Sequence, residues 1–142
     1  LSRILDDTYK VVMISLTDSQ IKSLPENILR LGRTKSIEEL AEWYTTADVF
    51  VNTTYDDNYP STNLEAQCCG TPAITYNTGG SIESVPDGNI VAQGDVKGLA
   101  KRIRQICSTG KDESINQEQV DAFGLETANR KYIETYEKLY RA

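Results

Sequence analysis

Residues 48–83 constrain the fold of this chain most, because apolar runs alternate there with polar loops and glycine turns. The apolar residues 49–51 predict a short strand that is buried on both faces. Pro60 suits the first turn of a helix, since its φ is already helical and its missing N–H is not needed there. Gly70 suits the position that follows a helix, and residues 72–76 are typical of the next strand. The stretch therefore predicts a strand, a polar loop, a helix and a second strand in succession.

The same alternation extends over the rest of the chain. Further strands are predicted at residues 9–16, 27–31 and 89–92. Helices are predicted at residues 19–24, 37–47, 95–108 and 124–140, with parts of two more at residues 1–7 and after Gly79-Gly80. Apolar residues at helical spacing predict the buried faces of two of them: Ile37, Leu40, Ala41 and Tyr44 in helix 37–47, and Val96, Leu99, Ile103 and Ile106 in helix 95–108. The expected N-cap residues are Asp18, Ser36 and Asp95. Strands that alternate with helices favour βαβ units, so the predicted fold class is α/β, a Rossmann-like open parallel sheet flanked by helices.

Composition excludes several classes of protein. The 142 residues suffice for one domain, and a formal net charge of −6 without a basic block argues against a nucleic-acid partner. The chain has no run of about 18 apolar residues, so no membrane span is expected. The absence of histidine removes the most common general base and any Ser-His-Asp triad. Cys68, Cys69 and Cys107 lack the spacing of a metal site, and we interpret them as buried apolar residues in a reducing, cytoplasmic compartment.

The predicted helix that starts near Pro60 is the candidate site. It begins just beyond the carboxyl end of a parallel strand, where open α/β sheets bind their ligands. The free N–H groups and the dipole of a helix start favour an anion, typically a phosphate. Asp57 and Glu65 flank this point, and the seven residues between them do not place both on one helical face. The spacing suits two ends of one polar ligand, with the helix start between them.

Five short motifs occur in order along the chain: Ala47-Asp-Val-Phe-Val51, Asp57-x7-Glu65, Leu64-Glu-Ala66, Cys69-Gly-Thr-Pro72 and Gly79-Gly80-x-x-Glu83. In this order and spacing they resemble the C-terminal half of retaining glycosyltransferases with the GT-B fold, those of family four (glycosyl transferases group one). The resemblance begins at residues 27–33 and 39–44 and ends at residues 93–95, so it covers most of the chain. It implies a domain that binds the donor while a sugar moves from a nucleoside-diphosphate sugar to a saccharide or lipid-linked acceptor, with retention at the anomeric carbon.

The resemblance also implies roles for individual residues. Glu65 would hold the ribose hydroxyls and Asp57 the hydroxyls of the donor sugar, which makes these two the implied catalytic residues. Asp57 stands where the family has the longer glutamate, so Asp56 is a second candidate for this contact. Pro60 replaces a family glycine. The other implied donor-binding residues are Gly32 and Arg33 near the base, Asn58 and Tyr59 in the loop, and Ser61 and Thr62 at the diphosphate.

Several expectations about the whole protein follow from the resemblance. The donor would be UDP- or GDP-linked, and neither a cofactor nor a metal is expected, since Asp56 and Asp57 are adjacent rather than spaced as in an Asp-x-Asp cluster. Residues 1–109 are assigned to the donor-binding domain and residues 110–142 to its helical extension. The family's phosphate-binding Arg/Lys pair and the acceptor-binding N-terminal domain are expected before Leu1, so this chain alone is expected to be inactive. Peripheral membrane contact by the full-length protein is left open.

Two other functions remain as alternatives. A non-catalytic α/β binding or regulatory module, such as a receiver-like domain, would have an acidic cluster after its first strand, where residues 15–18 contain one acid. A sugar-nucleotide epimerase on the same fold would release an isomerised nucleotide sugar instead of an acceptor product.

An apolar stripe on the last predicted helix permits two interpretations. Its members are Leu125, Ala128, Tyr132, Tyr136, Leu139 and Tyr140. The stripe would pack on this domain or dock on a partner domain, and the sequence does not separate the two.

Overall fold

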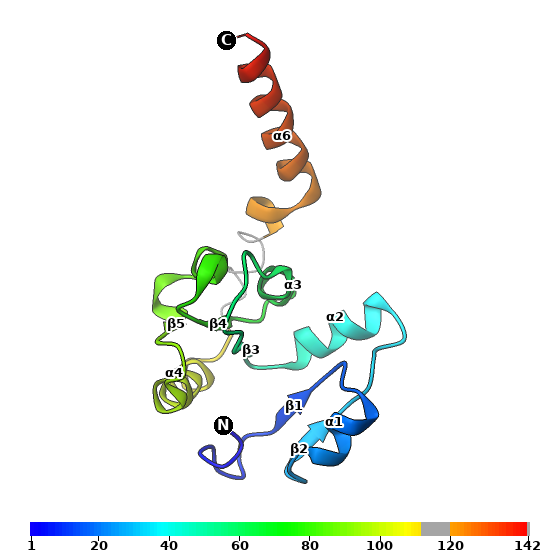
Figure 1. Ribbon diagram of the computed structural model, residues 1–142, viewed down its shortest axis with the longest axis vertical. Helices are drawn as coiled ribbons and strands as arrows, with labels where there is room; N and C mark the ends of the chain where they lie inside the picture. Colours follow the sequence, from blue (N-terminus) through cyan, green and yellow to red (C-terminus); the bar gives the residue numbers. More distant parts are fainter. Residues whose placement is uncertain (112–119, 142) are drawn as a thin grey trace.

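The computed structural model describes residues 1–111 and 120–141 of the chain (Figure 1). Its strands are β1 (Val11–Met13), β2 (Ile28–Arg30), β3 (Phe50–Asn52), β4 (Ala73–Tyr76) and β5 (Ile90–Val91). Its α-helices are α1 (Asp18–Ser23), α2 (Ile37–Thr46), α3 (Ser61–Cys68), α4 (Val96–Thr109) and α6 (Leu125–Tyr140). Two short 3-10 helices, η1 (Gly79–Ser84) and η2 (Asp87–Asn89), lie between β4 and β5. Strands and helices thus alternate through α4, as predicted.

All strand pairs in the described chain are parallel. β1 pairs with β2, and β4 pairs with both β3 and β5, so the strands form two hydrogen-bonded groups. All four residues of β4 are buried, which fits a central strand covered on both faces. The helices α1 to α4 lie beside these strands in Figure 1. The arrangement confirms the α/β fold class with parallel strands flanked by helices.

The N-terminal segment differs from the prediction. Residues 1–7 form turns and not the end of a helix, with the carbonyl of Leu1 accepting hydrogen bonds from the N–H groups of Ile4 and Leu5. Leu1 and Leu5 pack against the core, so burial of their side chains, rather than a helical ladder, holds this segment. The strands are also shorter than predicted; β1, for example, has three residues inside the predicted range 9–16.

Three helix starts were also predicted wrongly. Thr17, not Asp18, caps α1, because its side chain accepts from the N–H of Gln20 while Gln20 bonds back to Thr17. Pro60 precedes α3 as its N-cap with an extended ψ of 110°, instead of lying in the first turn. Residues after β4 form the 3-10 helix η1 and not the start of an α-helix.

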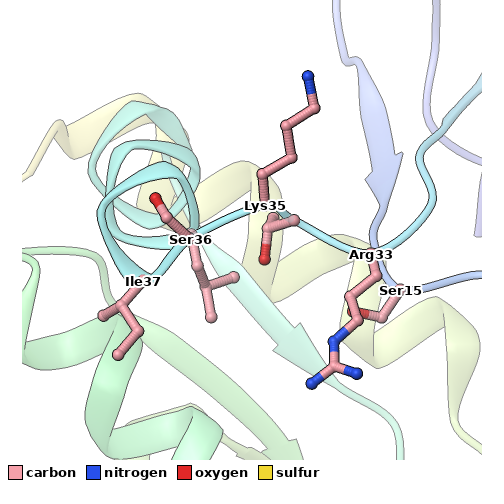
Figure 2. A pocket seen from close by; sticks show the side chains of 7 residues that line it. Ser15, Arg33, Lys35, Ser36 and Ile37 are labelled. Atoms are coloured by element: carbon pink, nitrogen blue, oxygen red, sulfur yellow. The ribbon is translucent and has the colours of Figure 1, made fainter.

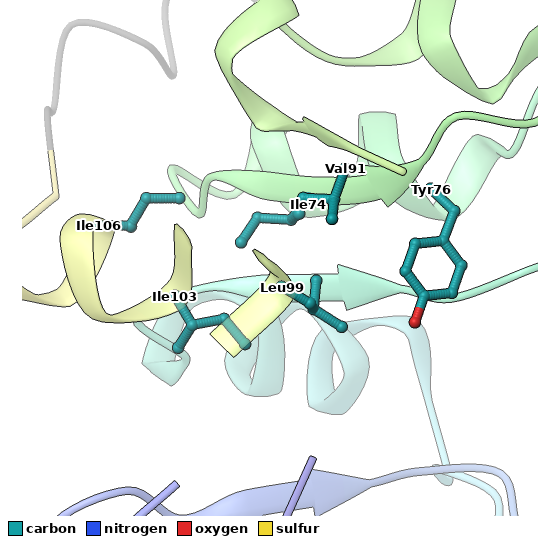
Figure 3. Packing of buried hydrophobic residues seen from close by; sticks show 6 residues of the cluster. All are labelled: Ile74, Tyr76, Val91, Leu99, Ile103 and Ile106. Carbon is teal, nitrogen blue, oxygen red and sulfur yellow. The ribbon is translucent and has the colours of Figure 1, made fainter. Parts of the chain in front are cut away.

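The core lies between α4 and the β3–β4–β5 group (Figure 3). Its buried residues are Ile74, Tyr76, Val91, Leu99, Ile103 and Ile106. The last three were predicted as the buried stripe of the helix, and this is confirmed. Val96 was predicted with them but is only half-buried, because it is the first residue of α4 and lies at the edge of the packed layer. Val51 of β3 packs against this cluster, which includes Ile74 and Tyr76 of β4, so the core joins the two strands to α4.

Asp95 caps α4 as predicted, since its Oδ1 accepts the N–H of Gly98 at 2.9 Å. Replacing Asp95 with alanine is expected to lower the free energy of unfolding by about 1 kcal/mol, because that N–H loses its acceptor. Urea denaturation measures the change. Asp95→Ser is the matched control, because a serine hydroxyl also caps helices. An equal loss in both variants would contradict the capping argument.

The helix α6 extends away from the strands (Figure 1). It has no buried residue, and Leu125, Tyr132, Tyr136, Leu139 and Tyr140 are between 68% and 93% exposed. The interpretation that this stripe packs on the domain is therefore wrong for these five residues. Docking on a partner domain stays a prediction.

Two further expectations concern the division of the chain and a membrane span. Residues 112–119 and 142 lie outside the described residues, so the division into 1–109 and 110–142 stays a prediction. Within the described chain, no helix has both the length and the apolar character that a membrane crossing requires.

Candidate functional site

The start of α3 is the centre of the candidate site. β3 ends at Asn52, a polar loop follows, and α3 begins at Ser61. The N-cap residue Pro60 has no side-chain acceptor for the first N–H groups of α3, whereas the N-cap side chains of α1, α2 and α4 each accept a backbone N–H. The first N–H groups of a helix have no acceptor inside the helix, so those of Ser61 and Thr62 are directed out of the helix start. The arrangement can hold an anion with backbone donors.

Glu65 lies one turn into α3, and both of its carboxylate oxygens accept hydrogen bonds. The hydroxyl of Ser61 donates to Oε1 at 3.1 Å, and the hydroxyl of Tyr44 on α2 donates to Oε2 at 3.2 Å. Ser61 and Glu65 are exposed, while Tyr44 is buried. The carboxylate is therefore held from its buried side yet remains accessible to a ligand.

Tyr44 is fixed by its surroundings. Its ring meets the ring of Phe50 edge to face, with centroids 5.4 Å apart, and its carbonyl accepts the hydroxyl of Thr71 at 2.5 Å. Burial raises the pKa of Tyr44, and the negative charge of Glu65 raises it further. The phenol therefore stays protonated and can only donate to the carboxylate.

Asp57 lies in the loop before α3, and its side-chain carboxylate and its backbone carbonyl accept hydrogen bonds from different partners. Its Oδ1 accepts the N–H of Tyr59 at 3.0 Å, and its backbone carbonyl accepts the N–H of Gly80 at 3.0 Å. The Asp57 carboxylate therefore stabilises its own loop, and its second oxygen remains for other contacts. Burial raises the pKa of the neighbouring Tyr59 phenol, and the negative charge of Glu83 raises it further.

The glycine pair after β4 explains how this loop is held. A Cβ on Gly80 would lie 1.7 Å from the carbonyl oxygen of Asn58, and one on Gly79 would lie 2.3 Å from that of Asp57. Gly79 also has a φ of +45°, which favours glycine. Both glycines therefore serve a close approach of one backbone to another, and the loop 57–58 is held between η1 and α3.

A buried polar network anchors α3 from behind. Asn52 of β3 donates to Asn63 at 3.1 Å, and Asn63 donates to the hydroxyl of Ser84 at 2.8 Å. Gln67 donates to the carbonyls of Asn63 and Ser84 at 2.8 and 2.7 Å. In the described chain, the hydroxyls of Thr75 and Ser81 are buried without a hydrogen-bond partner. The network joins β3, α3 and η1, so α3 has a fixed position relative to β3 and η1.

A second group of predicted residues lies at the carboxyl end of β2. Arg33 lines an open pocket of about 510 Å³ together with Ser15, Lys35 and the first residues of α2 (Figure 2). The carbonyl of Gly32 accepts the N–H of Ser15 at 3.1 Å, and Ser15 has a φ of +64°. The side chains of Arg33 and Lys35 point to opposite sides of the backbone. This pocket carries positive charge and hydroxyl groups.

The structure brings some of the predicted site residues into contact and places others in separate regions. Ser61 contacts Glu65, while Asp57, Asn58 and Tyr59 form one loop. Thr62 and Asp56 are exposed on either side of Pro60. The pocket that contains Arg33 is lined by none of these loop or α3 residues.

The side chain of Tyr59 faces a different, mostly apolar pocket. This pocket has about 440 Å³ and is also lined by Leu64 of α3 and by Phe123, Lys131 and Tyr132 near the start of α6. Its position places Tyr59 at the edge of the candidate site.

Sequence reasoning missed Tyr44 as a member of the site. The helical spacing of residues 37–47 placed it on the apolar face, and the structure confirms that Tyr44 is buried. The prediction was wrong for Ile37, which shares that face and is 82% exposed at the first position of the helix. A buried tyrosine usually finds a partner for its hydroxyl, and this was the available signal. Its partner, Glu65, lies 21 residues away and was not predictable from local pattern.

The described residues contain no group of three or more His, Cys, Asp or Glu side chains that could hold a metal ion. The three cysteines are free thiols that are half-buried, so the interpretation as buried residues is met only in part. Burial raises the pKa of the Cys68, Cys69 and Cys107 thiols, which keeps them protonated and unreactive at neutral pH.

Comparison with protein families identifies the chain. Residues 17–120 match the family described as glycosyl transferases group 1. The chain belongs to this glycosyltransferase family. The match includes β2, the loop 56–59 and α3, so it contains every predicted site residue of this family member. The family predicted from the motif order is thereby confirmed.

Individual relatives agree with this family. A D-inositol 3-phosphate glycosyltransferase of Paenarthrobacter aurescens (strain TC1) is 42% identical over 50 residues, which are 35% of this chain and 12% of that protein. The capsular polysaccharide biosynthesis glycosyltransferase CapM of Staphylococcus aureus is 31% identical over 86 residues, 58% of this chain and 22% of that protein. The aligned parts thus span less than a quarter of these curated relatives.

A solved structure supports the fold. The crystal structure of Anabaena Alr3699/HepE in complex with UDP matches with a TM-score of 0.76 at 20% identity, over 94% of this chain and 42% of that one. At this identity the likeness establishes the fold of the group 1 glycosyltransferase chain.

Proposed function

We propose that the chain is the donor-binding half of a retaining glycosyltransferase that uses a UDP- or GDP-linked sugar. The observation that carries the proposal is the start of α3, where no side chain caps the free N–H groups and the carboxylate of Glu65 lies one turn away. An anion and a neighbouring pair of hydroxyls fit this geometry, and a nucleoside diphosphate presents both. The UDP complex of a protein with the same fold supports this choice of ligand.

Stabilisation of the leaving group is the proposed source of catalysis. The bond between the sugar C1 and the diphosphate oxygen breaks, and its electron pair leaves with the nucleoside diphosphate. The acceptor hydroxyl oxygen bonds to C1, and its proton passes to the departing diphosphate. The N–H groups of Ser61 and Thr62 would oppose the charge that grows on that diphosphate, and such preorganised donors are often the largest contribution to catalysis.

The acidic residues would orient the donor. Glu65 would accept hydrogen bonds from the ribose hydroxyls, since its carboxylate is exposed on the side opposite Tyr44. The free carboxylate oxygen of Asp57 would accept from the donor sugar. The base would lie in the pocket beside Arg33, where a planar guanidinium can stack on an aromatic ring. We propose neither a metal nor a cofactor for this arrangement.

The rest of the protein enters only as part of the proposal. The acceptor would be a saccharide or a lipid-linked molecule, and the relatives named for capsular polysaccharide and inositol phosphate fit a hydroxyl acceptor. An N-terminal domain would bind that acceptor and supply the basic groups for the diphosphate. The exposed stripe on α6, from Leu125 to Tyr140, is the proposed contact with it. A cytoplasmic location, where nucleotide sugars are made, is proposed as well.

Calorimetry with UDP, GDP, uridine and guanosine tests the ligand class. We expect one diphosphate to bind weakly but about tenfold or more better than its nucleoside, because the helix start contributes only to the charged ligand. Equal binding of diphosphate and nucleoside would contradict the role of α3. Incubation with UDP-linked and GDP-linked sugars is expected to yield no transfer product, because acceptor binding is proposed to belong to a separate N-terminal domain. Robust transfer would contradict that, and an isomerised nucleotide sugar would favour the epimerase alternative.

A further inference from the structure

We propose that Tyr44 is a positioning residue that holds Glu65 in the orientation needed to bind the ribose of the donor. The inference rests on the proposed function, and it adds a residue from α2 to a site built from α3 and the loop before it. Two hydroxyls reach the same carboxylate from different elements, at 3.1 Å from Ser61 and at 3.2 Å from Tyr44. Their surroundings differ, and that difference separates their roles.

The Tyr44 side of the carboxylate is rigid. Tyr44 is 9% exposed, its ring packs edge to face on Phe50, and its carbonyl accepts the hydroxyl of Thr71. A buried phenol that loses its partner would leave an unsatisfied polar group, so the contact with Oε2 is favoured whether or not a ligand is bound. Tyr44 therefore sets the plane of the Glu65 carboxylate permanently.

The Ser61 side of the carboxylate is exchangeable. Ser61 is exposed and reaches Oε1 across one turn of α3, so its hydroxyl can rotate away at little cost. A ribose hydroxyl can take its place on Oε1, and the Ser61 hydroxyl is then released towards the diphosphate at the helix start. In the free chain, the Ser61 hydroxyl thus occupies the position on Oε1 that a ribose hydroxyl would take. Tyr44 keeps the Glu65 carboxylate oriented towards that position.

A purely structural role for the Tyr44 hydroxyl would give a different pattern. The ring contributes its packing on Phe50 without the oxygen, so Tyr44→Phe retains the shape of the core and removes only the donor. If the hydroxyl acts on nucleotide binding through Glu65, its removal has no further effect once Glu65 is gone. A double-mutant cycle measures this dependence directly.

The cycle comprises the unmodified chain, Tyr44→Phe, Glu65→Ala and the double variant, each titrated with UDP and GDP. We expect Tyr44→Phe to weaken binding of the preferred diphosphate about tenfold, as for the loss of a hydrogen bond to a charged group. In the Glu65→Ala background the same change is expected to alter binding by less than about twofold. Tyr140→Phe, at a 93% exposed tyrosine on α6, is the matched control and is expected to bind like the unmodified chain.

Each outcome has a distinct meaning. Equal losses from Tyr44→Phe in both backgrounds, or no loss in the first, would overturn the positioning role and leave the proposed function standing. No binding of either diphosphate by the unmodified, folded chain would overturn the proposed function and this inference with it. A crystal structure of Tyr44→Phe adds a readout without ligand: the Glu65 carboxylate is expected to rotate or become disordered, and an unchanged orientation would count against the inference.

Discussion

Replacing Gly80 with alanine is expected to destabilise the chain by about 3 kcal/mol and to abolish nucleotide binding. The added Cβ would lie 1.7 Å from the carbonyl oxygen of Asn58, and backbone atoms cannot turn aside as a flexible side chain does. The loop must move away from η1, which breaks the 3.0 Å hydrogen bond from the N–H of Gly80 to the carbonyl of Asp57. A loss of this size is a large fraction of the ~5–15 kcal/mol that holds a typical domain folded.

Urea denaturation and diphosphate titration together measure this prediction. Gly88→Ala is the matched control, because its Cβ would meet only the Arg102 side chain at 3.6 Å, an ordinary contact distance. The control is expected to unfold at nearly the same urea concentration as the unmodified chain. If Gly80→Ala and Gly88→Ala unfold alike, η1 does not clamp the loop in the way the structure indicates.

Replacing Glu65 with alanine is expected to weaken binding of the preferred diphosphate about 10- to 100-fold, more than Asp57→Ala does. Hydrogen bonds to a charged carboxylate contribute about 1.5–3 kcal/mol, which corresponds to that range. Glu65 would contact the ribose of the nucleotide, whereas Asp57 would contact the donor sugar, which a free nucleoside diphosphate lacks. One Asp57 oxygen is already engaged by the N–H of Tyr59.

Calorimetry with UDP and GDP separates the two acids. Glu134→Ala, at an exposed acid on α6, is the matched control for the loss of one negative charge. It is expected to leave binding unchanged. Equal losses from Glu65→Ala and Asp57→Ala would argue against assigning the ribose to Glu65. With a complete nucleotide sugar in place of the diphosphate, the loss from Asp57→Ala is expected to increase.

The site combines an accessible surface with a rigid support. Asn63 and Gln67 lie on the buried face of α3 and bond to β3 and η1, while Ser61 and Glu65 lie on its exposed face. Asn63, Gln67 and Ser84 each have hydrogen-bond partners, and buried polar side chains that are satisfied in this way hold a unique geometry. The helix start is therefore presented to a ligand without needing a side-chain cap of its own.

Much of the fold was predictable because the signals were local. The apolar run at β3, the glycine at position 70 and the buried stripe of α4 each depend on residues within a few positions of one another. Gly70 has a φ of +77°, as its predicted place after a helix requires. The cap at Asp95 was equally local. Boundaries were less predictable, as at Thr17 and Pro60, because a helix start can shift by one or two residues without a change in the local pattern.

The candidate site was predictable in part. The order of motifs identified Glu65 and Asp57 as candidates. Both residues flank the same helix start, so their closeness in space followed from their closeness in sequence. The partners of these residues were not predictable. Tyr44 reaches Glu65 from another helix, and Gly80 reaches Asp57 from beyond the next strand.

The sequence by itself determined the alternation of strands and helices, the family and the helix start that forms the candidate site, because each depends on residue types at short, regular spacing. The tertiary structure alone decided that Tyr44 meets Glu65, that Gly79 and Gly80 serve contact with a neighbouring loop, and that the α6 stripe is exposed. The physical reason is that these features depend on how separate elements approach in space. A residue's pattern in the chain shows that it needs a partner, but only packing selects which one.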